Sequence, residues 1–181
     1  MNSDMEAPTA RAPARVPARR SGPGRARQVV RWAKYPPRGD RGLFQANYEA
    51  GFGTVDAARH VEQSNLGRWL AVQIETPDAV ECVEDIAAVD GVDVLFIGTS
   101  DLTAELGISG QMGHPKVIAA YQAVGDACKK HGKHWGIVPV DPAYADRAYD
   151  LGCRMITFGN DIFALKTGIA SIKNSYKSRF G

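Results

Sequence analysis

The chain has 181 residues, 44% of them hydrophobic and 23% charged, and its formal net charge is only +2. These values suit one globular domain with its own core, and no apolar run approaches the ~20 residues that a membrane-spanning helix needs. Residues 1–27 contain six arginines and two acidic residues, Asp4 and Glu6, and so carry a net charge of +4. The rest of the chain therefore has a net charge of −2, which argues against nucleic acid as a partner.

Residues 1–27 are built almost entirely from Ala, Pro, Arg, Gly and Ser. Such a segment offers little apolar surface to offset the entropy of folding, so we expect a disordered leader followed by one domain over residues 28–181. An Arg-rich transit peptide is the alternative. The prolines, together with Asp4 and Glu6, disfavour the amphipathic helix that a transit peptide needs.

The segment 28–67 is expected to contain the end of a helix, a loop and then, over residues 43–67, a mixed stretch that is helical in pieces and interrupted by Gly51 and Gly53. Val29–Lys34 has the character of a helix end, which Tyr35-Pro36-Pro37 stops because proline disfavours helical geometry in the residue before it. Arg38 and Arg41 follow in a glycine-containing loop. Surface ion pairs are common, so we interpret both arginines as loop anchors rather than as binders of phosphate or substrate.

A regular alternation of strands and helices begins after residue 67. Apolar runs predict strands over 68–75, 93–98, 134–140 and 155–159, with helices over 77–91, 102–106, 115–131 and 142–152 and a terminal helix from residue 162. This alternation predicts an α/β fold with a parallel sheet of four βα units. The units form either a small open sheet or the C-terminal half of a TIM (β/α)8 barrel, since a complete barrel needs about 250 residues.

Two carboxylates follow neighbouring strands of this predicted sheet. Gln73 and Glu75 are two apart and therefore face the same way, and Asp101 stands at the entrance to a helix after the next strand. A Glu at a strand end is often only a solvated residue near a helix start. Two carboxylates at adjacent strand ends also suit one shared divalent cation, Mg²⁺ or Mn²⁺, chelated by a 2-oxo acid.

The surroundings of these carboxylates favour a hard cation over zinc. No cysteine lies in the site and no histidine is near it in sequence. The run Gly98-Thr99-Ser100 gives a ligand access to backbone N–H groups at a helix start, which favour an anion such as a carboxylate. Elsewhere, Cys82, Cys128 and Cys153 are far apart and read as free thiols of a reducing compartment, the cytoplasm.

Four stretches of the chain resemble the HpcH/HpaI aldolase family, a group of pyruvate-binding barrels. They are Lys34–Gly42 (KYPPRGDRG), Val72–Thr76 (VQIET), Leu95–Leu102 (LFIGTSDL) and Gly113–Pro115 (GHP), in order and with matching spacing. The resemblance implies a divalent-metal-dependent aldolase that cleaves a 4-hydroxy-2-oxo acid to pyruvate and an aldehyde. It also implies a homo-oligomer, and it matches Asp141 to a position near the active-site rim.

The same resemblance assigns roles to five residues. Glu75 and Asp101 match the metal ligands, while Gln73 and the backbone at Thr99 and Ser100 match the groups that hold the pyruvate moiety. The ion would act as a Lewis acid on the 2-oxo group.

Two family residues have no counterpart in this chain: a histidine of proton transfer and an arginine that grips the substrate carboxylate. His114 precedes a proline at a helix start and is interpreted as a cap or a loop-packing residue rather than a catalyst. A silent subunit that binds metal or pyruvate, paired with a chain that supplies the other half-barrel, is therefore one alternative. A citrate-lyase-like or malyl-CoA-type lyase is another.

Overall fold

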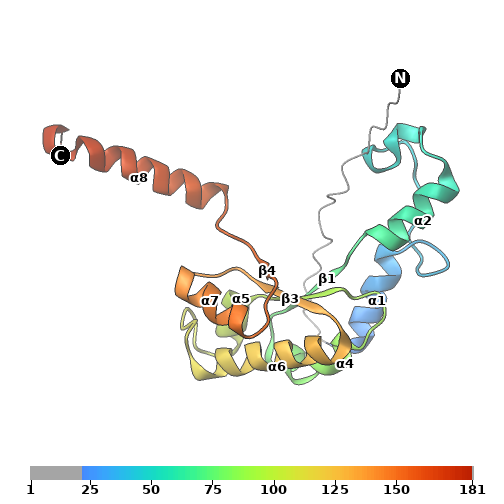
Figure 1. The fold of residues 1–181 in the computed structure, drawn as a ribbon, viewed down its shortest axis with the longest axis horizontal. Coiled ribbons are helices and arrows are strands. Elements are labelled where there is room, and N and C mark those ends of the chain that lie inside the picture. Colours follow the sequence, from blue (N-terminus) through green and yellow to red (C-terminus); the bar gives the residue numbers. More distant parts are fainter. Residues whose placement is uncertain (1–21, 181) are drawn as a thin grey trace.

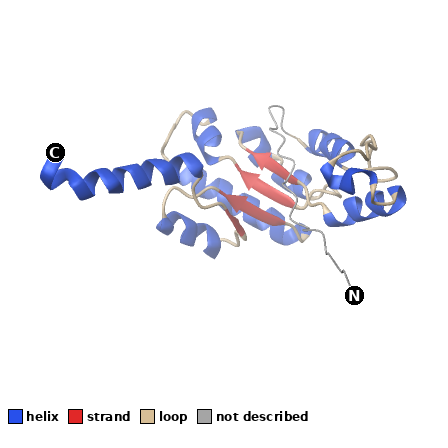
Figure 2. Ribbon diagram, turned by 90° about the horizontal axis from the view of Figure 1, so that it is seen from above, coloured by secondary structure: helices blue, strands red, loops and turns tan. Residues whose placement is uncertain are grey.

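A computed structural model of the chain describes residues 22–180, with side chains to residue 178. Its centre is a four-stranded parallel sheet in the order β1-β2-β3-β4, and the strands lie side by side in Figure 2. The strands are β1 (Ala71–Ile74), β2 (Val94–Ile97), β3 (His134–Ile137) and β4 (Met155–Ile156). The predicted α/β class with four parallel strands is therefore confirmed.

Helices precede, connect and follow these strands (Figure 1). They are α1 (Pro23–Ala33), the 3-10 helix η1 (Tyr48–Gly53), α2 (Ala57–Gly67), α3 (Pro77–Glu81), α4 (Val83–Ala87), α5 (Thr99–Glu105), α6 (Pro115–His131), α7 (Pro142–Asp150) and α8 (Asp161–Phe180). No helix within residues 22–180 combines the length and the apolar character needed to cross a membrane.

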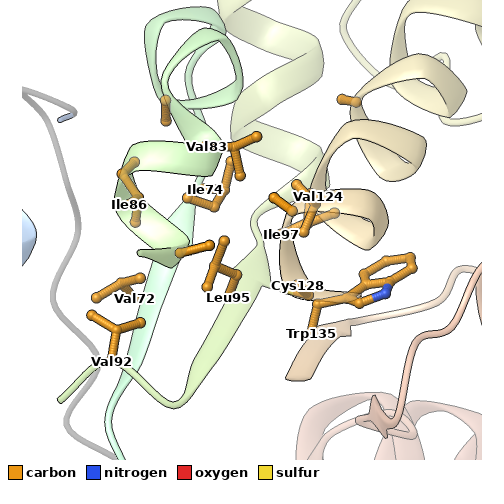
Figure 3. Close-up of a cluster of buried hydrophobic side chains, with 14 of the residues drawn as sticks. Val72, Ile74, Val83, Ile86, Val92, Leu95, Ile97, Val124, Cys128 and Trp135 are labelled. Carbon is orange, nitrogen blue, oxygen red and sulfur yellow. The ribbon is translucent and has the colours of Figure 1, made fainter. Parts of the chain in front are cut away.

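The hydrophobic core lies between one face of the sheet and the helices α4 and α6 (Figure 3). Alternate strand residues supply the sheet side, because successive side chains point to opposite faces. Those with the lowest exposure are Ile74, Leu95, Ile97, Trp135 and Ile137. The opposite face therefore carries Gln73, Phe96 and Gly136, which lie in one row across the sheet.

Side-chain caps fix where the helices begin. Thr76 Oγ1 accepts the N–H of Ala79 at 3.2 Å, His114 Nδ1 accepts that of Lys116 at 3.2 Å, and Asp141 Oδ1 accepts that of Tyr144 at 2.8 Å. A proline follows each cap as the first helical residue, where its missing N–H costs nothing. The predicted bounds of α6 and the capping role of His114 are confirmed.

Three sequence expectations need correction. Helix α1 begins at Pro23 and buries Ala26, so residues 23–27 are not part of a disordered leader; residues 1–21 lie outside the described part. The helix predicted over 77–91 divides at Cys82, whose ψ of 21° is not helical, and the turn lets Val83, Ile86 and Ala87 all be buried. Helix α5 starts at Thr99 rather than at residue 102.

A set of buried hydrogen bonds, which we call the latch, connects the end of α1 to α2 and to the residues just before β1. Lys34 is 4% exposed, and its Nζ donates to the carbonyls of Asn65 and Arg68. The Asn65 side chain pairs with both backbone groups of Tyr35, at 2.8 and 3.0 Å. Burial lowers the pKa of Lys34 below its usual value. Because these groups are hydrogen-bonded, the latch fixes the loop that follows α1.

Gly125 in α6 tests how closely α6 packs against the end of α7. Alanine normally stabilises a helix relative to glycine, but a β-carbon at Gly125 would lie 2.8 Å from the Leu151 carbonyl oxygen. We expect Gly125→Ala to destabilise the fold by about 1–3 kcal/mol in chemical denaturation. The matched control is Gly168→Ala in α8, where no atom lies within 4 Å. A stabilised Gly125→Ala variant would contradict this packing.

Candidate active site

The site is built where the carboxyl ends of β1 and β2 meet. Ile74 pairs with Ile97, and one residue further the Gly98 N–H donates to the Ile74 carbonyl at 2.9 Å. This bond extends the parallel register beyond both strands. Glu75 is consequently level with Gly98, at the edge where α/β proteins bind their ligands.

Gln73 and Glu75 converge on the backbone of Gly98. A β-carbon at Gly98 would lie only 2.4 Å from Gln73 Nε2 and 3.2 Å from Glu75 Oε2. Both side chains are buried, with exposed fractions of 2% and 7%. The prediction that the two residues project together is thus confirmed in the folded chain, and a β-carbon at position 98 would crowd both side chains.

The turn from Gly98 to Asp101 carries the remaining candidates. It forms the first turn of α5, whose N-cap Gly98 makes no side-chain capping bond. Thr99 is buried, whereas Ser100 and Asp101 are exposed. The structure therefore brings a buried carboxylate and an exposed one to neighbouring strand ends.

Thr99 has a partner that the sequence did not reveal. Its Oγ1 lies 2.7 Å from the hydroxyl of Tyr121 in α6, which in turn bonds the hydroxyl of Tyr144 in α7. The spacing of α6 places Tyr121 in its apolar stripe but says nothing of its hydroxyl. The one available signal is that a buried tyrosine needs a hydrogen-bond partner.

The other polar candidates have structural partners. Arg41 and Arg68 both pair with Glu49, at 2.8 and 2.6 Å, and Arg38 pairs with Asp90 at 3.5 Å. The interpretation of Arg38 and Arg41 as loop anchors is confirmed by these contacts. His60 lies within 3.3 Å of the Tyr35 hydroxyl, at the amino-terminal edge of the sheet.

The donor set of this edge suits a hard cation. Between residues 22 and 180 no group of three or more His, Cys, Asp and Glu side chains is arranged to enclose a metal ion. Two carboxylates and an amide leave most coordination positions to water and ligand oxygens, which is how Mg²⁺ is usually bound. Glu75 and Asp101 are of the residue type that supplies ligands to such an ion, and they do not form a closed zinc site.

Comparison with known proteins gives a consistent picture. Residues 15–167 match the model of the family described as HpcH/HpaI aldolase/citrate lyase. The chain is 38% identical over 152 residues to the 5-keto-4-deoxy-D-glucarate aldolase of Klebsiella pneumoniae, covering 84% of this chain and 59% of that protein. The corresponding Enterobacter protein is 37% identical over 150 residues, with coverages of 83% and 58%.

Solved structures agree with this match. The crystal structure of an HpcH/HpaI aldolase from Desulfitobacterium hafniense superposes with a TM-score of 0.78 at 36% identity, covering 88% of this chain and 62% of that one. A Burkholderia cenocepacia protein of the aldolase/citrate lyase family gives a TM-score of 0.77 at 33% identity, covering 86% and 62%. The chain thus spans less than two thirds of the length of these relatives.

Substitution of Gly98 tests the convergence of Gln73 and Glu75. In Gly98→Ala the Gln73 amide has to turn away, because it is the flexible end of the contact. We expect a loss of about 1–3 kcal/mol of stability by chemical denaturation. Gly113→Ala is the control, since no atom lies within 4 Å of its β-carbon position. Equal stability of the two variants would mean that the side chains do not converge on Gly98.

Proposed function

Because the chain belongs to the HpcH/HpaI aldolase/citrate lyase family, we propose that it serves a metal-dependent aldol cleavage of a 4-hydroxy-2-oxo acid to pyruvate and an aldehyde. The observation that carries this proposal is the convergence of buried Gln73 and Glu75 on Gly98, one turn before Asp101. The four parallel βα units would form part of an eightfold barrel.

The names of the relatives support the substrate class. A 5-keto-4-deoxy-glucarate, numbered from its other carboxyl group, is a 2-oxo-3-deoxy acid with a hydroxyl at carbon 4. Aldol cleavage of such an acid breaks the bond between carbons 3 and 4. The carbon-4 hydroxyl loses its proton and becomes the aldehyde, while the electron pair stays with the pyruvate fragment, which takes up a proton at carbon 3.

The proposed roles follow from the burial of each group. Glu75 and Asp101 would hold Mg²⁺ or Mn²⁺, which when bound supplies a Lewis acid for the 2-oxo group. The Gln73 amide would donate to an oxygen of the oxo acid, since its Nε2 lies beside Gly98 in a water-poor position. The backbone at Thr99 and Ser100 would contact the carboxylate, and Gly98 leaves the room for that approach.

A second candidate is a subunit that binds metal and oxo acid without turnover. A partner chain or a second copy would then supply the remaining groups. A citrate-lyase-like reaction is a third candidate within the same family, because the family description includes citrate lyase.

The free thiols at Cys82, Cys128 and Cys153 suit a reducing compartment, and we propose the cytoplasm.

Thermal unfolding with and without Mn²⁺ plus pyruvate tests the ligand site. Ligands that bind only the native state stabilise it, so a 100-fold excess over Kd should raise Tm by about 5–10 °C. EDTA should reverse the shift. Release of pyruvate from a 4-hydroxy-2-oxo acid, followed by a coupled assay, then separates aldolase from silent subunit. Absence of any shift in a cooperatively folded chain would overturn the proposed site.

Isosteric substitutions test the two carboxylates. Glu75→Gln and Asp101→Asn should each weaken Mn²⁺ binding at least tenfold in calorimetry, since even groups that merely support a ligand contribute 10- to 100-fold. The matched control is Asp146→Asn, an exposed residue of α7. Retained Mn²⁺ affinity in both site variants, with the control unchanged, would refute the assignment.

A further inference from the structure

Three hydroxyl groups from three helices form one continuous chain beside the candidate site. Thr99 Oγ1 in α5 lies 2.7 Å from Tyr121 OH in α6, Tyr121 OH bonds Tyr144 OH in α7, and Tyr144 OH donates to the Met112 carbonyl at 3.3 Å. We call these four groups the hydroxyl chain. Thr99, Tyr121 and Tyr144 are all buried.

The direction of the hydroxyl chain is fixed at one end. The Met112 carbonyl can only accept, so the Tyr144 proton is committed to it. The Tyr144 oxygen then accepts from Tyr121, and the Tyr121 oxygen accepts from Thr99. The single hydroxyl proton of Thr99 is therefore used inside the protein, and a ligand at this edge can meet only the backbone of Thr99 as a donor.

The tyrosines are held by their rings as well. Tyr121 packs against both Trp135 and Tyr144 with ring centroids 5.6 Å apart in each pair. Burial raises the pKa of both tyrosines above the ordinary value, so the hydroxyls stay protonated at neutral pH. The hydroxyl chain is consequently a fixed set of hydrogen bonds and does not titrate in the physiological range.

Thr99 connects the hydroxyl chain to the candidate site. Thr99 directly follows Gly98, on which Gln73 and Glu75 converge, and it precedes Asp101 by two residues. The other three groups of the hydroxyl chain lie on α6, on α7 and in the loop between α5 and α6. The hydroxyl chain thus connects the turn Gly98–Asp101 to α6, to α7 and to the loop that precedes α6.

We propose that Tyr121 and Tyr144 are positioning residues, whose hydroxyl groups hold the Gly98–Asp101 turn in register with Glu75 and thereby set the affinity for a divalent ion and its 2-oxo acid. The proposal rests on the proposed function for the identity of the ligand. Its structural part, the bracing of the turn, stands independently of any ligand.

Two variants remove hydroxyl groups while keeping shape. Tyr121→Phe retains the ring contacts, and Thr99→Val is isosteric with threonine. Thr99→Ser restores the hydroxyl and serves as the rescue. Tyr35→Phe is the matched control, because Tyr35 is equally buried and its hydroxyl bonds His60 in α2, outside the hydroxyl chain. All variants are made in the full chain.

Amide hydrogen exchange without ligand is the first readout. The Gly98 amide bonds the Ile74 carbonyl and the Leu102 amide bonds the Gly98 carbonyl, both at 2.9 Å. Exchange at these two amides should accelerate several-fold in Tyr121→Phe and Thr99→Val, and in neither Thr99→Ser nor Tyr35→Phe. Unchanged exchange in Tyr121→Phe and Thr99→Val would overturn the proposal.

Titration with Mn²⁺ in the presence of pyruvate is the second readout. Tyr121→Phe and Thr99→Val should bind about 3- to 10-fold more weakly than the wild type, the size expected for one lost hydrogen bond. Tyr35→Phe should bind normally even if its Tm falls by the same amount. Equal affinity in wild type and Tyr121→Phe would overturn the positioning role. A wild type that binds neither ligand, with exchange altered as expected, would support the brace and overturn the proposed function instead.

Discussion

The parallel pairing of β1 with β2 is the constraint on which the site depends. Register fixes which residues are level across the sheet, and the bond from Gly98 N–H to the Ile74 carbonyl carries that register past the last paired residue. Slipping the pairing by one residue would turn Gln73 and Glu75 to the helix-covered face. Glu75 is therefore positioned by the same hydrogen bonds that hold the sheet together.

The burial of Gln73 and Glu75 restricts which groups can lie at the carboxyl ends of β1 and β2. Gln73 and Glu75 lie in a region where an unsatisfied polar group costs several kcal/mol, so their partners are part of the fold. Gly98 is small enough for both side chains to approach its backbone. A cation with its oxo acid would complete the same polar cluster, which is why we regard convergence on Gly98 as the central feature of the proposed site.

The two edges of the sheet are stabilised in different ways. At the amino-terminal edge, Lys34 and Asn65 satisfy backbone carbonyls, and Asp93 accepts the N–H of Leu70 at 2.7 Å, so the polar groups there bond the protein itself. At the carboxyl-terminal edge, the protein braces its turn through Thr99 and Tyr121 and leaves Ser100 and Asp101 exposed. The polar groups of the first edge thus bond the protein itself, whereas the second edge leaves two polar residues exposed.

The sequence by itself determined the elements whose signals are local. Alternating strands and helices and the bounds of α6 follow from residues that are close in the chain, and the likeness to the aldolase family follows from four short stretches in a fixed order. Only the tertiary structure decided the start of α5, the break at Cys82 and the partners of Thr99, which lie 22 and more positions away. Spacing along a helix specifies the side that faces the core, but the pairing of one buried hydroxyl with another depends on how separate helices pack.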